Sequence, residues 1–307
     1  MSPSFDVIVA GSYSVDLIFT GLPNFPQLGK DVVGTGFEMT PGEAYISSIS
    51  MHRLGLNIGW AGDFGTDEFS RLALDPAKVE GLDDSLFIIH KRPYRRISVS
   101  ASYPDDRAFI TYYDPDPDVP AVVHALAKSN AKVLYIPGLY SGDFLSSGLP
   151  LLQFKHMKLV MDGNSSDGDI FRNCKDSKAI KKAIQHTDIF MPNAQETRRI
   201  TGQQDIESAI RCLGELCPLV IVKDGQNGSY AYVKGQLYHA PAIKINSIDT
   251  TGAGDNYNAG FLKAWLDGLP IEGCLKWGNI VGGLSTTALG GTTRVITIQE
   301  VEKYLSD

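Results

Sequence analysis

One glycine-rich stretch, residues 248–260 with the sequence IDTTGAGDNYNAG, constrains the fold of this chain more than any other. The preceding run, 243–248, carries alternating isoleucines that favour a β-strand. The following run, 257–265, places apolar side chains at helical spacing. The glycines are therefore expected on a strand-to-helix turn, at the N-terminus of a helix.

Such a turn suits an anion such as phosphate. Because Gly252, Ala253 and Gly254 have little or no side chain, their N–H groups can close around an anion, and the helix dipole adds to the attraction. Asp255 would repel that anion unless it takes up a proton during a reaction. A carboxylate there can accept the proton of an attacking hydroxyl while the amides stabilise a transferring phosphoryl group.

A structural alternative exists for the same four residues. Asp255 could cap the helix while the glycines only turn the chain, and the residues alone leave the two interpretations about even. Two other phosphate motifs are excluded, because the stretch lacks the Lys and Ser/Thr of a Walker loop and the G-x-G-x-x-G spacing.

Composition describes an ordinary soluble globular protein of 307 residues, with 43% hydrophobic residues and a net charge of −7. The acidic balance argues against a nucleic-acid partner. No apolar run approaches the ~20 residues that span a membrane, and residues 1–11 lack a basic segment typical of signal peptides. The cysteines form no C-x-x-C pair, so reduced thiols and a cytoplasmic location are expected: Cys174, Cys212, Cys217 and Cys274.

Several short apolar runs predict buried strands of a parallel sheet, for example 6–10 and 158–162. Two other segments, about 12–40 and 92–115, instead combine β-prone residues with Pro and Gly turns. We expect these two segments to form a small sheet apart from the main one, inserted in a single domain that spans 1–307.

The run DTTGAGD, followed by NYNAGFL, resembles the signature of the ribokinase-like (PfkB) family of carbohydrate and nucleoside kinases. The resemblance implies a doubly wound α/β fold, whose mainly parallel sheet has helices on both faces, with a small β lid over the sugar. It also implies that Asp255 is the catalytic base and that the amides of Gly252 to Gly254 hold the γ-phosphate of ATP. A closing lid would exclude water from the reaction.

The resemblance extends to the substrate side. Gly11 to Asp16 match a G-x-x-x-x-D pattern whose Asp binds sugar hydroxyls, although a turn residue is the alternative for Asp16. The family's G-G-x-x-x-N loop is altered, because Pro41 and Ile46 replace its first Gly and its Asn. Gly42 remains, and Glu43 beside it is expected to line the pocket. The altered loop leaves the identity of the substrate open.

The nucleotide side carries two further matches. Asn193 to Glu196 resemble the N-x-x-E motif, in which the Glu helps to hold Mg²⁺, usually through water, although a helix-capping box is the alternative. Lys223, Gly225 and Gly228 match a K-x-G-x-x-G pattern near the ATP phosphates.

Weaker matches to positions of the family give the remaining candidate residues. Asn279 matches a position near the adenine, and Asp249 and Thr251 match positions that surround a monovalent cation, usually K⁺, in several relatives. The resemblance also allows a homodimer formed through the lid.

The chain is thus predicted to be an ATP- and Mg²⁺-dependent sugar kinase. A nucleoside kinase is the alternative, since the altered loop with Tyr13 nearby leaves room for a base, and a non-catalytic binding protein is a further one. Asp16 and Glu43 in one pocket favour an uncharged substrate. Arg95 and Arg96 could reverse that charge, but on a strand at most one of them can face the pocket.

Overall fold

The computed structural model describes residues 4–103, 107–140, 143–164 and 178–306. Eight strands of this part of the chain form the main sheet, in the order β14-β13-β12-β11-β10-β9-β1-β4. Their bounds are β1 Ser4–Ala10, β4 Ile58–Ala61, β9 Asn130–Ile136, β10 Lys158–Asp162, β11 Ile189–Met191, β12 Leu219–Lys223, β13 Ser229–Val233 and β14 Gln236–Ala240. The neighbouring strands β12, β11, β10, β9, β1 and β4 run parallel to one another, whereas β13 pairs antiparallel with both β12 and β14. The prediction of a mainly parallel sheet is confirmed.

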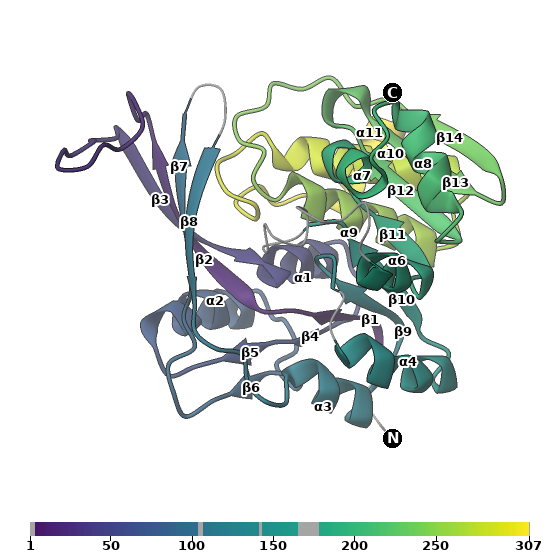
Figure 1. Cartoon of the computed structure of the whole chain (residues 1–307), viewed down its shortest axis with the longest axis horizontal. Coiled ribbons are helices and arrows are strands. Elements are labelled where there is room, and N and C mark those ends of the chain that lie inside the picture. Colours follow the sequence, from purple (N-terminus) through teal and green to yellow (C-terminus); the bar gives the residue numbers. More distant parts are fainter. Residues whose placement is uncertain (1–3, 104–106, 141–142, 165–177, 307) are drawn as a thin grey trace.

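Helices cover both faces of this sheet (Figure 1). One hydrophobic core lies under α1 Ala44–Arg53, α2 Glu68–Val79, α9 Ala253–Leu266, α10 Ile271–Ser285 and α11 Ile298–Ser306. The other lies under α3 Ala121–Lys128, α4 Asp143–Phe154, α6 Lys178–Gln185, α7 Ala194–Thr201 and α8 Ile206–Gly214. Val7 and Val9 of β1 face the first core, while Ile8 and Ala10 face the second. A strand buried on both faces must be apolar throughout, which explains its continuous apolar run.

The two segments with β character form a separate four-stranded sheet, the lid. Its strands are β2 Tyr13–Thr20, β3 Gly36–Glu43, β7 Arg96–Ser102 and β8 Arg107–Tyr113, in the order β3-β2-β7-β8. Figure 1 shows the lid standing away from the main sheet, with the loop between β2 and β3 at its tip. Two short strands, β5 Asp63–Phe64 and β6 Ile88–Ile89, pair at its foot.

The lid has one mainly polar face, which also carries Phe109, and one apolar face. Asp16 pairs with Ser98 of β7, and both lie on one face. Phe19 and Phe37 are paired on the opposite face with ring centroids 5.1 Å apart, because side chains alternate along a strand. Ile110 on the same apolar face is 73% exposed. The polar face is therefore the one suited to a hydrophilic substrate.

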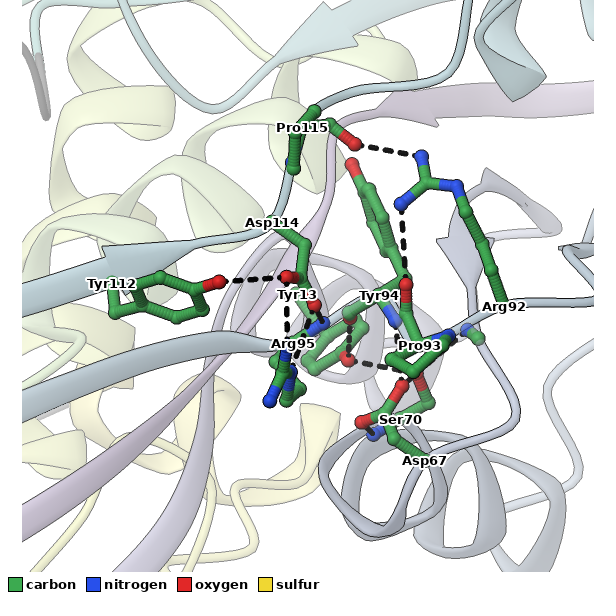
Figure 2. A network of polar contacts seen from close by, with 11 residues as sticks. Tyr13, Asp67, Ser70, Arg92, Pro93, Tyr94, Arg95, Tyr112, Asp114 and Pro115 are labelled. Atoms are coloured by element: carbon green, nitrogen blue, oxygen red, sulfur yellow. Dashed lines mark hydrogen bonds and ion pairs between the residues drawn. The ribbon is translucent and has the colours of Figure 1, made fainter.

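A buried polar network ties the base of the lid to helix α2 (Figure 2). The hydroxyl of Tyr13 donates a 2.5 Å hydrogen bond to the carbonyl of Tyr94 and lies 2.8 Å from Oγ of Ser70. Asp67, the N-cap of α2, accepts from the backbone amide of Tyr94 at 2.7 Å. Since these bonds join the first residue of β2 and the segment before β7 to α2, they fix the direction in which the lid leaves the main body.

One predicted strand is absent from the described chain. Residues 243–248 form no strand, because β14 ends at Ala240 and Pro241 interrupts the pattern. The amides of Ile248 and Asp249 instead donate to the carbonyl of Thr286, beyond the end of α10. The chain therefore reaches the glycine-rich turn by packing along α10, and the predicted helix after that turn is confirmed as α9.

Two further expectations concern the chain as a whole. Within the described ranges, no helix is long and apolar enough to cross a membrane. Cys212, Cys217 and Cys274 are free thiols, while Cys174 lies outside the described residues. The cytoplasmic location stays a prediction.

Candidate active site

The candidate residues gather where the carboxyl ends of the parallel strands meet the N-terminus of α9. Tyr135 lies near the end of β9, Asp162 ends β10 and Lys223 ends β12. Asp255 lies in the first turn of α9. In open α/β sheets this edge is the usual place of a ligand site, because loops and helix N-termini converge there.

Gly252 is the N-cap of α9 and has a φ of 69°. A Cβ at this position would lie 2.8 Å from Cα of Gly291, so neither the conformation nor the space suits another residue. The amide of Ala253 donates to the carbonyl of Thr250 at 3.2 Å. Gly252 therefore shapes the turn, and the amide of Ala253 is already engaged within it.

Outside its own helix, a Cβ on Gly254 would contact only the side chain of Lys223 among the described residues. The nearest atom to a Cβ placed there is Nζ of Lys223, at 3.5 Å. The amides of Gly254 and Asp255 belong to the first turn of α9, where a helix offers no intrahelical acceptor. The result is a cradle of free amides bordered by an ammonium group, which fits a phosphoryl oxygen.

Asp255 does not cap α9, because the helix has no side-chain cap and its N-cap is Gly252. Its Oδ1 accepts a 2.5 Å hydrogen bond from the hydroxyl of Ser47 on α1. The pKa of Asp255 is raised to about 7: burial is the largest cause and the charge of Asp162 adds to it, while the hydrogen bond from Ser47 and the charge of Lys223 partly offset them. A carboxylate with a pKa near neutrality is suited to general base catalysis.

An ion pair stands beside the cradle. Nζ of Lys223 lies 2.8 and 2.9 Å from the two carboxylate oxygens of Asp162. Asn258 on α9 donates to Asp162 at 2.6 Å and to the hydroxyl of Tyr135 at 2.9 Å. Asp162, Asn258 and Tyr135 were not predicted as site residues, although the position of Asp162 at the end of a predicted parallel strand was a usable signal.

The motif at 193–196 forms the capping box that was the structural alternative. Oδ1 of Asn193 accepts from the amide of Glu196 at 2.8 Å, and Glu196 accepts from the amide of Asn193 at 2.7 Å. Burial, followed by the charge of Asp162, raises the pKa of Glu196 to about 7. A Cβ on Gly163 would lie 2.5 Å from Oε2 of Glu196, so this carboxylate abuts the end of β10.

The glycines of the K-x-G-x-x-G pattern differ in their surroundings. Gly228, with φ 91°, packs against the backbone of Ala240, whereas a Cβ on Gly225 would meet nothing within 4 Å. Asn279 donates its side-chain amide to the carbonyls of Ala240 and Pro241 at 2.9 and 3.0 Å. Asn279 thus stabilises the turn that follows β14.

The candidate cation residues lie in the turn before α9. Oδ1 of Asp249 accepts from the amide and hydroxyl of Thr251 at 3.0 and 2.8 Å, and Oδ2 accepts from the amide of Gly290 at 2.8 Å. Across the described ranges, no group of three or more His, Cys, Asp or Glu side chains could hold a metal ion by itself. Any ion here would therefore take ligands from backbone, water or substrate as well.

On the substrate side, the structure brings the predicted residues together. Oδ1 of Asp16 accepts from the hydroxyl of Ser14 at 3.0 Å, and a Cβ on Gly42 would lie 2.6 Å from Oδ2 of Asp16. Glu43 has φ 55° and accepts from the hydroxyl of Tyr113 at 2.9 Å. Burial raises the pKa of Glu43, and Asp16 is among the acids that raise it further, whereas Arg96 and the Tyr113 hydrogen bond lower it.

A family model described as the pfkB family carbohydrate kinase matches residues 6–298, nearly the whole chain. The chain belongs to this family. This PfkB kinase is 25% identical to the ribokinase of Bacillus subtilis (strain 168) over 312 residues, which cover 98% of this chain and 99% of the relative. It is 24% identical to the 5-dehydro-2-deoxygluconokinase of the same organism over 320 residues, covering 98% and 96%.

Solved structures agree with the fold of this PfkB kinase. The structure of Arabidopsis thaliana ribokinase complexed with ribose and ATP matches with a TM-score of 0.80 and 19% identity, and covers 100% of both chains. At that level of identity the match shows the shared ribokinase-like fold, which confirms the predicted fold class.

The two lid arginines of this PfkB kinase point to opposite sides, as strand alternation predicts. The guanidinium of Arg96 lies 3.9 Å above the ring of Tyr113, on the side of Glu43, and pairs with Asp116 at 2.9 Å. Arg95 pairs with Asp114 at 3.0 Å, and its side chain is 43% exposed. Of the two, Arg96 is therefore the one that lies beside Glu43.

The structure shows where the two residues that depart from the family pattern, Ile46 and Pro41, pack. Ile46 is 3% exposed and packs behind the cradle, against Gly252 and Gly291. Pro41 pairs with Val15 on the apolar face of the lid. Neither residue lines the polar face that carries Asp16.

Proposed function

We propose that this PfkB kinase transfers the γ-phosphoryl group of ATP to a hydroxyl of a small uncharged sugar. The observation that carries the proposal is the juxtaposition of Asp255, with a pKa of about 7, and the open cradle at Gly254 bordered by Lys223. The polar face of the lid with Asp16 provides hydrogen-bond acceptors for the sugar.

The proposed mechanism assigns one role to each group. Asp255 accepts the proton of the sugar hydroxyl, whose oxygen bonds to the γ-phosphorus while the bond to the bridging oxygen of ADP breaks. The amides of Gly254 and Asp255, rather than that of Ala253, stabilise the charge on the transferred group, as Lys223 does from one side.

The remaining predicted residues belong to the nucleotide and its ions. We assign Asn193 and Glu196 of the capping box to the nucleotide side, where Glu196 would hold Mg²⁺ through water, and the bound ion would neutralise charge on the ATP phosphates. Gly225 faces open space suited to the approach of the nucleotide. Asp249 and Thr251 would contribute to a monovalent cation site in the adjoining turn.

The charges in the pocket favour an uncharged substrate. Asp16 and Glu43 bring acidic groups, and Asp116 already pairs with Arg96. Because these carboxylates balance the positive charge of Arg96, a negatively charged group on the substrate would meet net repulsion. A neutral sugar, by contrast, offers hydroxyl donors to carboxylate acceptors.

The nucleoside alternative loses one of its supports. Tyr13, the aromatic residue considered for a base, is fully buried, and its hydroxyl is bound to Tyr94 and Ser70 (Figure 2). It therefore cannot stack on a ligand in the pocket. Tyr94 is also buried, and the guanidinium of Arg96 covers the ring of Tyr113.

Turnover with ribose, fructose, adenosine and cytidine, measured side by side with ATP and Mg²⁺, tests the proposal. We expect phosphorylation of a neutral sugar and little of either nucleoside. Fructose compared with fructose 6-phosphate across a salt series tests the charge. A clear preference for the phosphorylated sugar that weakens with salt would overturn the neutral substrate and make Arg96 a phosphate ligand.

A thermal-shift screen with the same compounds and an ATP analogue separates catalysis from binding alone. A ligand at 100 times its dissociation constant stabilises the folded state by about 2.7 kcal/mol. Clear stabilisation by a sugar and the analogue, without any turnover with ATP, would favour the non-catalytic alternative.

The apolar face of the lid supports a homodimer formed through the lid. Large apolar side chains gather there in the open: Phe19, Phe37, Met39, Ile110 and Tyr112. A second copy of the lid would cover this face. We expect sedimentation of a dimer that Ile110→Glu dissociates, and a wild-type monomer at every concentration would contradict the dimer.

A further inference from the structure

The ion pair between Lys223 and Asp162 is almost completely enclosed. The two side chains are 12% and 7% exposed, and Nζ of Lys223 lies 2.8 Å from Oδ1 of Asp162. Withdrawing both charges from water is costly, and mutual attraction offsets that cost only where further hydrogen bonds fix the geometry. Such a pair is weak evidence for stability, so its position next to the cradle calls for another explanation.

Asp162 is held by more than its lysine. The amide of Gly163 donates to Oδ1 at 2.6 Å, and the side-chain amide of Asn258 donates to Oδ2 at 2.6 Å. Asn258 is itself fully buried; its amide also donates to the hydroxyl of Tyr135 at 2.9 Å, and its Oδ1 accepts from Nζ of Lys223 at 3.4 Å. Because donors reach both carboxylate oxygens from strand and helix, the carboxylate has a fixed place.

Lys223 is thereby aimed at the cradle. Its Nζ lies 3.5 Å from the point that a Cβ on Gly254 would occupy. A lysine ammonium stands on a flexible four-carbon chain and acts as a point charge, so its place depends on the partner that holds it. Here that partner is Asp162, which keeps the charge beside the open space and not out in solvent.

We propose that Asp162 is a positioning residue for phosphoryl transfer, holding the ammonium of Lys223 at the edge of the Gly254 cradle where the γ-phosphoryl group is transferred. This inference rests on the proposed function. A charge that is already in place stabilises the transition state without reorganising during the reaction. Asp162 itself touches neither substrate and acts only through Lys223.

The role predicts a split between kcat and the KM for ATP. Asp162→Asn keeps the size of the side chain but releases the ammonium, and misplacement of a reacting-centre group lowers kcat by about 10–100-fold. The same change removes a negative charge near the nucleotide, so affinity for ATP stays equal or rises. A residue needed only for folding would lower the melting temperature and leave the kcat of the folded enzyme unchanged.

A double-mutant cycle tests whether Asp162 acts through Lys223. Lys223→Met removes the ammonium, so we expect lower kcat and weaker ATP binding. Adding Asp162→Asn to Lys223→Met should change kcat by less than about twofold, because no charge is left to position. Losses that multiply in the double variant would show that Asp162 acts independently and would overturn the proposal.

The same strand offers a matched control. At the other end of β10, Nζ of Lys158 lies 2.8 Å from Oδ1 of Asp188, far from the cradle. Asp188→Asn removes an ion pair of equal length and should leave kcat unchanged. Should Asp162→Asn fail to fold, Asn258→Ser removes a donor to Asp162 and a weaker acceptor of Lys223 at 3.4 Å. This variant should also lower kcat with unchanged affinity for ATP, and it should add little to Lys223→Met. An unchanged kcat would again overturn the role.

Calorimetry with ADP and a non-hydrolysable ATP analogue, in the presence of Mg²⁺, gives a readout without turnover. We expect Asp162→Asn to bind the analogue at least as tightly as the wild type and Lys223→Met to bind it more weakly. A wild type that binds neither nucleotide would contradict the proposed function itself. A wild type that binds and turns over, with normal kcat in Asp162→Asn, would contradict only the role of Asp162.

Discussion

The hydroxyl of Ser47 donates a 2.5 Å hydrogen bond to Oδ1 of Asp255, although 208 residues separate the two in the chain. The bond joins α1 to the first turn of α9. It holds the carboxylate away from the helix amides, so that Asp255 faces the site instead of capping its own helix. Because the donor favours the ionised form, it also lowers the pKa that burial has raised.

Asp255→Asn should keep the fold and lose turnover by roughly 10²–10⁴-fold, because the amide cannot accept the hydroxyl proton. The measurement is kcat with the best sugar from the substrate comparison. Asp267→Asn is the control, since Asp267 closes the same helix and pairs with Lys263 on the surface. Near-normal phosphorylation by purified Asp255→Asn would refute the role of the base.

The pH dependence of kcat/KM should follow the ionisation of the Asp255 carboxyl. A base with a pKa of about 7 must be ionised to act, so activity should rise with pH and level off above neutrality. Ser47→Ala removes the donor that lowers this pKa and should move the rise to higher pH. A flat profile from pH 5 to 8, or an unmoved one in Ser47→Ala, would argue against this assignment.

Folding stability should respond to pH in the opposite direction. The pKa of Asp255 is about 4 in the unfolded chain and about 7 in the folded one, so the folded state binds the proton more tightly. The stabilisation is present below pH 4 and is lost as pH rises through 7. The melting temperature of Asp255→Asn minus that of the wild type should therefore increase from pH 5 to pH 8. Glu196 titrates in both proteins, so its effect on stability cancels in the difference between the two melting temperatures.

Two glycines of the turn should respond differently to substitution. Gly254→Val places carbon beside the flexible end of Lys223, in the space proposed for the γ-phosphate, so the protein should fold normally but lose ATP turnover more than sugar binding. Gly252→Val is strained by its φ of 69° and its contact with Gly291, so it should lower the melting temperature. Equal loss of sugar binding and turnover in Gly254→Val, with a lowered melting temperature, would point to a purely structural turn.

The sequence by itself determined the layers of the fold and the centre of the chemistry. Continuous apolar runs such as 6–10 specify strands buried on both faces, and small residues before Asp255 specify a helix start with free amides. These are local properties, because a few consecutive residues decide them. The strand expected at 243–248 failed because a strand also needs a neighbour, and the chain there bonds to Thr286 instead.

Only the tertiary structure decided how distant residues meet. Ser47 and Asp255, or Asp162 and Lys223, become partners because helices and parallel strands bring their ends to one edge of the sheet. Strand alternation predicted that at most one of Arg95 and Arg96 faces the substrate side. The contacts with Tyr113 and Asp116 show that this residue is Arg96. Hydrogen bonds and burial between segments far apart in the chain leave no periodic mark in the sequence, so the charges around Asp255 could be located only in three dimensions.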